Sequence, residues 1–339
     1  MRTIKDVAEL SGVSIATVSR ILNNRGKISE KTRQKVYGVM KELNYFPNEM
    51  ARSLQSKSRI IGIIVPHIHY PFFSYLLESV EEACSAEGYK LLLCKSGGEG
   101  EKEADMVSML RANKVAGILL CSRVGDTSVY TDCDMPIISI DRDIPHIPYV
   151  TSNNYNGGEL AAQALAAAGC KSPILFSGRF PEYMAASLRN TGFQDECERR
   201  GMKCLVHYIN QTYSATDPLP EAFLKFVKEH PEADGIFANG DVLAVNLMIG
   251  IRKQHMKELA DLPIVGYDGL EASEHFDLTT IAQPIREMGE CAVDLLLKKI
   301  KGKMVPERSV LPVRLVERAS TLAAPKHAKA RQPAVKTKA

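Results

Sequence analysis

The hydrophobic pattern of the first 47 residues predicts three short helices. Apolar faces at helical spacing are formed by Val7, Ala8 and Leu10, by Val18, Ile21 and Leu22, and by Val36, Val39, Met40 and Leu43. Gly12 stands where the first helix is expected to stop, and Ser14 and Ser29 are suited to cap the next two helices. Pro47 disfavours helix at the residue before it, so we expect this unit to end near residue 47.

From Arg59 onward, short apolar runs alternate with amphipathic stretches. The runs expected to be buried strands are residues 60–65, 90–94, 117–121, 137–140, 174–176, 235–238 and 264–267. The stretches expected to be helices are roughly residues 74–87, 101–113, 156–168, 184–200, 218–229, 241–253 and 286–300. This alternation predicts an α/β fold of parallel sheets with helices on both faces. The rhythm restarts near residue 153, which predicts two lobes.

The second predicted helix keeps one face free of apolar packing. The residues on that face are Ile15, Ala16, Ser19, Arg20 and Asn23. Short side chains and an arginine on the free face of a helix that follows a tight turn are typical of a helix-turn-helix, whose second helix enters the major groove of DNA. The alternative is a helical hairpin that packs and binds nothing.

The distribution of charge favours a contact with a polyanion at the N-terminal end. The chain has a formal net charge of +3, but residues 1–58 hold 11 Lys and Arg against 5 Asp and Glu, a net +6. Residues 325–339 hold 5 Lys and Arg and no acid, which leaves −8 for residues 59–324. A basic head on an acidic body indicates that the head meets nucleic acid.

Composition narrows the class of protein. The chain has 339 residues, 45% of them hydrophobic and 24% charged, which is typical of a globular protein with two or three domains. No apolar run approaches the roughly 20 residues of a membrane helix, and the N-terminus lacks a signal-peptide pattern. We therefore expect a cytoplasmic protein with no membrane contact.

Cysteine spacing and motif searches predict no metal, cofactor or catalysis. The eight cysteines include no Cys-x-x-Cys pair and are expected to be small buried side chains: Cys84, Cys94, Cys121, Cys133, Cys170, Cys197, Cys204 and Cys291. The chain contains no strand-linked G-x-G-x-x-G, Walker, G-x-S-x-G or H-E-x-x-H motif. An enzyme is therefore disfavoured.

The opening residues resemble the DNA-binding headpiece of the lactose/galactose repressor (LacI/GalR) family. Residues 3–23 match T-I-x-D-V-A-x-x-A-G-V-S-x-x-T-V-S-R-x-L-N with Ser11 in place of Ala, and residues 43–48 match L-x-Y-x-P-N. The resemblance implies a homodimer that reads a pseudo-palindromic double-stranded operator. The expected DNA contacts are Thr3, Ser14, Ile15, Ala16, Thr17, Ser19, Arg20, Asn23, Asn48, Ser53, Leu54 and Gln55. Of these, Ser14, Thr17 and Ser19 are expected at phosphates, and Ile15, Ala16 and Arg20 at bases.

The segment after the headpiece is expected to act as a hinge. Asn48 can cap residues 49–56, but two helical turns are marginal in water. The resemblance implies that residues 48–58 form a helix on operator DNA and that Leu54 wedges into a minor-groove step. A plain linker is the alternative. Residues 325–339 are expected to be a basic disordered tail without the Leu heptads of a tetramer, so we expect a dimer.

For residues 59–324 the resemblance implies the periplasmic sugar-binding-protein fold, with a ligand cleft between two lobes. We place the N-lobe at about residues 59–152 and 284–310, and the C-lobe at about 153–283 and 311–324. The chain is then expected to cross between lobes near residues 152–156, 281–286 and 309–312.

Residues just past the predicted strands are the candidates for ligand binding, because ligands of open α/β sheets bind at the carboxyl ends of strands. They are Phe72, Phe73, Asp141, Arg142, Arg189, Asn239, Asp241, Asp268 and Gln283. Arg189 lies in an R-x-x-G-F motif that the family places in the cleft, and its fork of donors suits hydroxyls or a carboxylate. The alternatives are core packing for the phenylalanines, a salt bridge for Asp141 and Arg142, and helix capping for Asp241.

This set of side chains suits a polyhydroxylated ligand. The expected function is a repressor of a carbohydrate-utilisation operon, controlled by a sugar or sugar phosphate in the cleft. A nucleobase or nucleoside effector, a protein corepressor, and a solute-binding protein without a DNA role are the alternatives.

Overall fold

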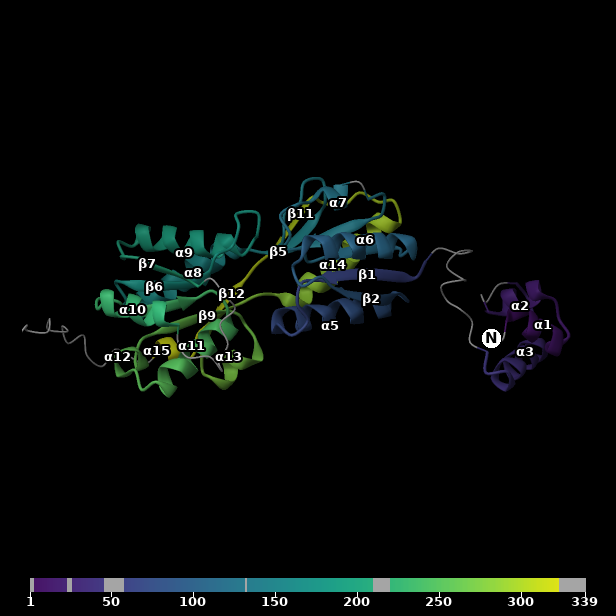
Figure 1. Ribbon diagram of the computed structural model, residues 1–339, viewed down its shortest axis with the longest axis horizontal. Helices are drawn as coiled ribbons and strands as arrows, with labels where there is room; N and C mark the ends of the chain where they lie inside the picture. The colour runs from purple at the N-terminus through teal and green to yellow at the C-terminus, as the bar shows by residue number, and fades with distance from the viewer. Residues whose placement is uncertain (1–2, 23–25, 46–57, 132, 210–219, 323–339) are drawn as a thin grey trace, which may run out of the picture. The chain divides into compact units, whose positions relative to one another are not determined.

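The computed structural model describes residues 3–22, 26–45, 58–131, 133–209 and 220–322 (Figure 1). The chain divides into two compact units, Met1–Arg59 and Ile60–Ala339. The expected DNA contacts Asn23, Asn48, Ser53, Leu54 and Gln55 lie outside the described residues. So do residues 48–57 of the expected hinge and the whole of the tail, residues 325–339.

The first unit is a three-helix bundle of α1 (Ile4–Ser11), α2 (Ile15–Leu22) and α3 (Glu30–Glu42). Gly12 ends α1 in the left-handed conformation, with φ 63°. The Oγ of Ser14 accepts from the N–H of Thr17 at 3.1 Å, and Ser29 caps α3 in the same way. The core consists of Val7, Ala8, Val18, Ile21 and Val36.

The prediction that Leu10 belongs to the apolar face of the first helix is wrong. The side chain of Leu10 is 58% exposed, and Ser11 is buried in its place. A helix turns 100° per residue, so the face that carries Val7 and Ala8 returns at Ser11. The Ser11 hydroxyl donates to the carbonyl of Val7 at 2.5 Å, which lets a polar side chain enter the core.

The second unit contains two six-stranded sheets in its described part. The first has the order β11-β5-β4-β3-β1-β2, with all neighbours parallel. Its strands are β1 (Ile60–Val65), β2 (Lys90–Lys95), β3 (Gly117–Leu120), β4 (Ile137–Ile140), β5 (Tyr149–Ser152) and β11 (Arg308–Leu311). The helices α5 (Pro71–Ala86) and α14 (Ile285–Ile300) cover one face, and α6 (Gly100–Ala112) and α7 (Ser128–Thr131) cover the other. This sheet and its helices are the first lobe.

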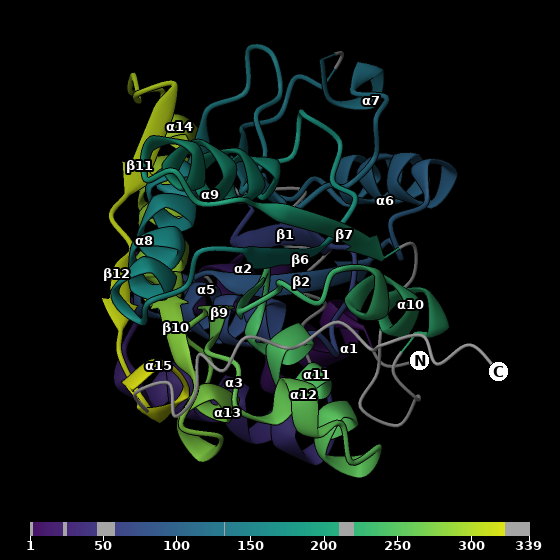
Figure 2. The ribbon, with the colours of Figure 1, turned by 90° about the vertical axis from the view of Figure 1, so that its left-hand side faces the viewer.

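The second sheet has the order β12-β10-β9-β8-β6-β7, and only β12 runs antiparallel to its neighbour. Its strands are β6 (Pro173–Gly178), β7 (Leu205–Ile209), β8 (Gly235–Ala238), β9 (Ile264–Asp268), β10 (Thr279–Ala282) and β12 (Arg314–Val316). The helices α8 (Asn154–Ala167) and α9 (Ser187–Arg199) cover one face, while α10 (Glu221–Glu229) and α11 (Asp241–Lys253) cover the other (Figure 2). The short helices α12 (Lys257–Ala260), α13 (Glu271–His275) and α15 (Ala319–Leu322) complete this second lobe.

The chain passes between the two lobes three times. It does so after Ser152 at the end of β5, after Ala282 at the end of β10, and between Leu311 and Arg314. The α/β fold of two parallel-sheet lobes with an N-terminal helical headpiece, predicted from the sequence, is confirmed.

Two glycines bring α8 and α9 into backbone contact. A Cβ on Gly158 of α8 would meet the carbonyl oxygen of Arg189, and a Cβ on Gly192 of α9 would meet the carbonyl oxygen of Tyr155. Both neighbouring atoms belong to the backbone and cannot swing away. Glycine at these two positions therefore allows α8 and α9 to approach closely. This approach fixes the position from which the side chain of Arg189 extends.

All eight cysteines carry free thiols, and five of them are buried: Cys84, Cys94, Cys121, Cys170 and Cys197. In the described part of the chain, no helix is both long and apolar enough to cross a bilayer.

Candidate functional site

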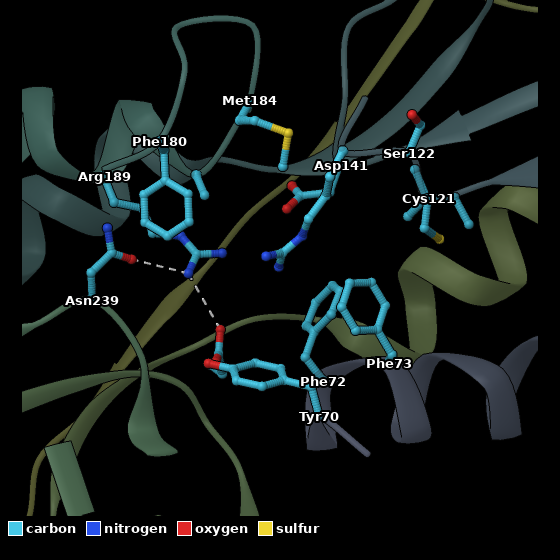
Figure 3. Close-up of a pocket in the computed structure, with 14 residues that line it drawn as sticks. Tyr70, Phe72, Phe73, Cys121, Ser122, Asp141, Phe180, Met184, Arg189 and Asn239 are labelled. Carbon is cyan, nitrogen blue, oxygen red and sulfur yellow. Dashed lines mark hydrogen bonds and ion pairs between the residues drawn. The ribbon is translucent and has the colours of Figure 1, made fainter. Parts of the chain in front are cut away.

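A pocket lies between the carboxyl ends of the strands of both sheets (Figure 3). Six of the expected ligand residues line it together: Phe72, Phe73, Asp141, Arg189, Asn239 and Asp268. The first three come from the first lobe and the last three from the second. The cavity measures about 60 Å³, which holds a few waters if each needs roughly 10–15 Å³. A ligand larger than a few waters therefore needs a wider cavity than this arrangement of the lobes provides.

Arg189 is held on three sides by the second lobe. Its Nε donates to Oδ1 of Asn154 at 2.7 Å, and its Nη1 donates to Oδ1 of Asn239 at 3.2 Å. The same Nη1 lies 3.4 Å from Oδ1 of Asp268, and the guanidinium carbon stands 3.8 Å from the ring centroid of Tyr267. Figure 3 shows the guanidinium reaching into the pocket beside Asn239. A planar fork fixed in this way is preorganised to bind oxygen atoms of a ligand.

Asp268 is a buried carboxylate at the end of β9. Its Oδ1 also accepts from Nε2 of Gln283 at 2.7 Å, and its backbone has a φ of 114°. A non-glycine residue rarely adopts this conformation, and such strain is concentrated at functional sites. Burial raises the pKa of Asp268 to about 6, and Arg189 opposes the rise. The group is therefore an acceptor at neutral pH that can take up a proton in mild acid.

Asp141 is the corresponding carboxylate of the first lobe, at the end of β4. It lies in the left-handed region with φ 57°, and Figure 3 shows its side chain pointing into the pocket. Its Oδ1 accepts from Oγ1 of Thr151 at 2.7 Å and from Nδ2 of Asn154 at 3.3 Å. Since the other end of the Asn154 amide accepts from Arg189, this one side chain links the polar groups of the two lobes. No sequence motif marked Asn154.

Aromatic side chains form the floor of the pocket on the first lobe. Phe72 and Phe73, in the first turn of α5, pack edge to face with centroids 5.3 Å apart. Both are buried in the core of the lobe and both line the pocket, so the packing and ligand interpretations apply together. Tyr70 precedes them, and burial raises the pKa of its phenol, which keeps it a hydrogen-bond donor.

Three expected ligand residues lie behind the lining instead of in it: Arg142, Asp241 and Gln283. The Nη1 of Arg142 donates to Oγ of Ser122 at 2.6 Å, and the guanidinium stacks 4.7 Å from the ring of Tyr183. No ion pair joins it to Asp141 in the described structure, so the salt-bridge alternative is wrong. The side chain of Gln283 connects Asp268 to Ser152. Its Nε2 donates to Oδ1 of Asp268, and its Oε1 accepts from Oγ of Ser152 at 2.6 Å.

Asp241 does not cap α11 as the alternative interpretation held, because Gly240 is the N-cap residue. The carboxylate is fully buried. It accepts from the N–H of Leu270 at 2.7 Å and from Oγ1 of Thr280 at 2.5 Å, and so ties α11 to the loop that follows β9. Burial raises its pKa to about 7, and the charge of Asp268 adds to the rise.

This raised pKa predicts a pH-dependent stability. An unfolded Asp has a pKa near 3.9, so folding takes up a proton on Asp241 between about pH 4 and pH 7. The stabilisation from that proton is complete below pH 4 and is lost as the pH rises through 7. Asp241→Asn imitates the neutral form, with an amide that can still pair with Thr280 and Leu270. In urea unfolding from pH 5 to 8, the variant should lose less stability than the wild type as the pH rises.

The control is an exposed carboxylate. Asp294→Asn removes a surface pair with Lys298 at 2.6 Å, and should change the free energy of unfolding by less than about 1 kcal/mol throughout. An unchanged pH slope in Asp241→Asn would contradict the role of Asp241.

The structure adds pocket residues that the strand-end candidates did not include. Arg123 follows β3, and Phe180 and Met184 belong to the segment 179–186 between β6 and α9. This segment of the second lobe contacts the first lobe: Met184 pairs with Arg142 in an isolated β-bridge, and the Tyr183 hydroxyl donates to the carbonyl of Arg123 at 3.4 Å. These contacts close one side of the pocket.

In the first unit, the expected DNA-contacting residues that the structure describes lie at the surface. Thr3, Ser14, Ile15, Ala16 and Arg20 are exposed, and Thr17 and Ser19 are half-buried. Ile15 is 44% exposed, which is high for a large apolar side chain in a small bundle. The free face of α2 is therefore open to a groove of DNA.

Two family models match the chain, one for each unit. The model for bacterial regulatory proteins of the lacI family matches residues 3–48. The model for periplasmic binding proteins and the sugar binding domain of the LacI family matches residues 58–319.

Relatives with known names match over nearly the whole length. The sucrose operon repressor of Streptococcus mutans is 38% identical over 317 residues, which are 92% of this chain and 97% of the relative. The ribose operon repressor of Halalkalibacterium halodurans is 35% identical over 331 residues, which are 95% of this chain and 97% of the relative.

Solved structures show the same fold. The Lac repressor dimer bound to operator and the anti-inducer ONPF has a TM-score of 0.80 at 28% identity, and the match covers 95% of this chain and 99% of that chain. The periplasmic binding protein/LacI transcriptional regulator from Alkaliphilus metalliredigens, complexed with D-xylulofuranose, has a TM-score of 0.70 at 30% identity, with 78% and 100% covered.

Proposed function

Because the chain belongs to the LacI family of bacterial regulatory proteins, we propose that it represses a carbohydrate-utilisation operon under the control of a sugar. The observation that carries this proposal is the pairing of two features in one chain. One is a basic helix-turn-helix with an open recognition helix. The other is an interlobe pocket in which Arg189, Asp141, Asp268 and Asn239 converge. Several donors and acceptors around an aromatic floor suit a polyhydroxylated ligand.

The proposed division of labour follows the sequence. Residues 1–47 read DNA and residues 48–58 form the hinge. Residues 59–324 bind the effector and dimerise, with the N-lobe at about 59–152 and 284–310 and the C-lobe at about 153–283 and 311–324. The protein acts on operator DNA in the cytoplasm and has no catalytic step, so a bound sugar is released chemically unchanged.

Two headpieces of a homodimer are proposed to read the half-sites of a pseudo-palindromic operator in successive major grooves. Ser14, Thr17 and Ser19 bind phosphates, and Arg20 binds a guanine while Ile15 and Ala16 contact thymine methyls. Thr3, Asn23, Asn48 and Ser53 add backbone contacts. Leu54, beside Gln55, is proposed to open a minor-groove step and bend the duplex.

The effector is proposed to act by a population shift. The pocket is lined by both lobes, so a ligand that contacts both changes the balance between open and closed arrangements. β1 follows the hinge segment directly along the chain, so a change in the first lobe is passed to that segment. We propose that sugar lowers the population able to bind the operator, which is a coupling free energy between two sites.

Removing the headpiece separates the two activities. A chain of residues 60–339 should keep its affinity for the sugar and lose operator affinity by at least about 100-fold, since it lacks the helix-turn-helix. The operator is obtained by selection from random double-stranded DNA with the full chain, and sugars are screened by thermal shift. Operator affinity is then measured by fluorescence anisotropy with and without sugar.

A solute-binding protein without a DNA role would give a different result: the selection would enrich no pseudo-palindrome, and deletion of residues 1–59 would change nothing. Conversion of the bound sugar into a product would overturn the non-catalytic part of the proposal.

A further inference from the structure

Arg123 is a charged residue of the pocket that forms no ion pair with a carboxylate of the described residues. It follows β3 and lines the pocket with Asp141, Arg189 and Phe73. Its guanidinium carbon stands 5.6 Å from the ring centroid of Phe73, and the carbonyl of Arg123 accepts from Tyr183. Among the described residues, its guanidinium makes no hydrogen bond and no ion pair. All five of its N–H donors are therefore available to a ligand.

The second arginine of the pocket is in the opposite situation. Arg189 already donates to Asn154 and Asn239 and pairs with the carboxylate of Asp268. The pocket thus holds one arginine with an acidic partner in contact and one without. Asp141 attracts Arg123 electrostatically without forming an ion pair with it, and its own Oδ1 accepts from the neutral donors Thr151 and Asn154.

The wall behind Arg123 adds positive charge. Arg142 is 1% exposed, and its described hydrogen bonds go to neutral oxygens of Ser122 and Gly125. The acid that acts on Arg142 is Glu103, whose Oε1 accepts from the hydroxyl of Tyr130 and whose pKa is raised by burial. The side chain of Arg123 is exposed, and an arginine stays charged at any physiological pH. The first lobe thus presents two arginines, Arg123 in the lining and Arg142 behind it, against one lining carboxylate, Asp141.

We infer that Arg123 binds an oxyanion carried by the effector, so that the effector is a sugar with a phosphate ester or a carboxylate and not a neutral sugar. This inference rests on the proposed function and names the chemical class of its ligand. A guanidinium matches both oxyanions with two parallel N–H donors, and a phosphate ester carries about −1.5 to −2 charge at neutral pH. The Phe73 ring lies 5.6 Å from the guanidinium carbon, at a cation–π distance that leaves the N–H donors of Arg123 unused.

The experiment compares each neutral sugar with its charged counterpart on the full chain by isothermal titration calorimetry. The pairs are ribose and ribose 5-phosphate, fructose and fructose 6-phosphate, sucrose and sucrose 6-phosphate, and glucose with glucose 6-phosphate and glucuronate. Arg123→Met removes the charge and keeps the length of the side chain. Arg111→Met is the matched control, because it removes an exposed arginine of the same lobe that pairs with Asp134 at 3.6 Å, outside the pocket.

At least one charged ligand should bind at least about 10-fold more tightly than its neutral partner. Arg123→Met should weaken that ligand by about 10- to 100-fold and leave the neutral sugar within about 2-fold, while Arg111→Met changes neither. A phosphate ester or a uronate as the preferred ligand supports the inference, and the preferred one identifies the source of the oxyanion.

Two results would overturn it. The first is that a neutral sugar binds best, or that Arg123→Met weakens the binding of neutral and charged sugars equally. Arg123 would then donate to hydroxyls, and the proposal of a repressor controlled by a sugar would still stand. If no sugar of either kind binds, the proposed effector class fails together with this inference.

Discussion

Arg189→Ala should leave the protein bound to its operator at sugar concentrations that release the wild type. Its Nη2 makes no hydrogen bond within the described residues and can donate to the effector, while Nε and Nη1 are held by Asn154, Asn239 and Asp268. Hydrogen bonds from a charged group contribute about 1.5–3 kcal/mol each. Loss of one or two such hydrogen bonds lowers the affinity for the effector by about 100-fold or more. Asp268 also loses its ion partner at 3.4 Å, and an unpaired buried carboxylate is costly. The effector affinity is measured by calorimetry, and release from the operator by fluorescence anisotropy.

The matched control is Arg199→Ala, at the other end of the same helix. Arg199 is exposed and pairs with Glu159 and Glu196 at 2.5 and 2.7 Å, away from the pocket. It should keep the wild-type response to sugar. If Arg189→Ala instead lost operator binding and kept its sugar affinity, the second lobe would not hold the effector.

Long apolar runs predicted seven strands of the two sheets. Each predicted run overlaps one strand of the structure, namely β1, β2, β3, β4, β6, β8 or β9, because a run such as Ile60–Val65 can only be buried on both faces. β10 (Thr279–Ala282) was not predicted, although Thr279 and Thr280 are fully buried. Their hydroxyls pair with Thr321 and Asp241, far away in the sequence. Local pattern cannot reveal that a polar residue will find such partners.

The other strands that were not predicted have related causes. β5 (Tyr149–Ser152) ends in Thr and Ser, and its burial depends on Asp141 and Gln283 as partners. β7, β11 and β12 contain many half-buried residues, since they lie at or near the edges of their sheets. Edge strands need no continuous apolar run. Their existence follows from pairing with a neighbour, which is a long-range property.

The nine ligand residues were predicted from the rule that ligands bind at the carboxyl ends of strands, and six of them line the pocket. The rule cannot tell which way the side chain of a residue at a strand end points. Asp141 and Arg142 are consecutive, so their side chains leave the chain in different directions, and only Asp141 reaches the pocket. The same rule applied to β3 would have found Arg123, whose position just past Leu120 was overlooked. Asn154 follows β5, a strand that the pattern did not reveal.

Gly158→Ala should destabilise the second unit and weaken its effector binding together. The new Cβ would overlap the backbone carbonyl of Arg189, so α8 and α9 must separate. Overpacking of this kind costs about 1–3 kcal/mol, and a shift of α9 also moves Arg189 away from Asn239 and Asp268. Urea unfolding measures the loss of stability, and calorimetry measures the loss of effector affinity, which should reach about 10-fold.

A glycine without close neighbours gives the opposite sign. Gly38, in α3 of the first unit, has nothing within 4 Å of an added Cβ, and Gly38→Ala should stabilise that unit by about 0.5–1 kcal/mol because alanine favours the helix. Both variants add a methyl group inside a helix, and the expected signs differ because of what that methyl group meets. If Gly158→Ala were as stable as the wild type and bound sugar equally well, the approach of α8 to α9 would not be what positions Arg189. If Gly158→Ala lost stability but kept its sugar affinity, helix packing would not determine the position of Arg189. Its polar partners alone would then hold the side chain in place.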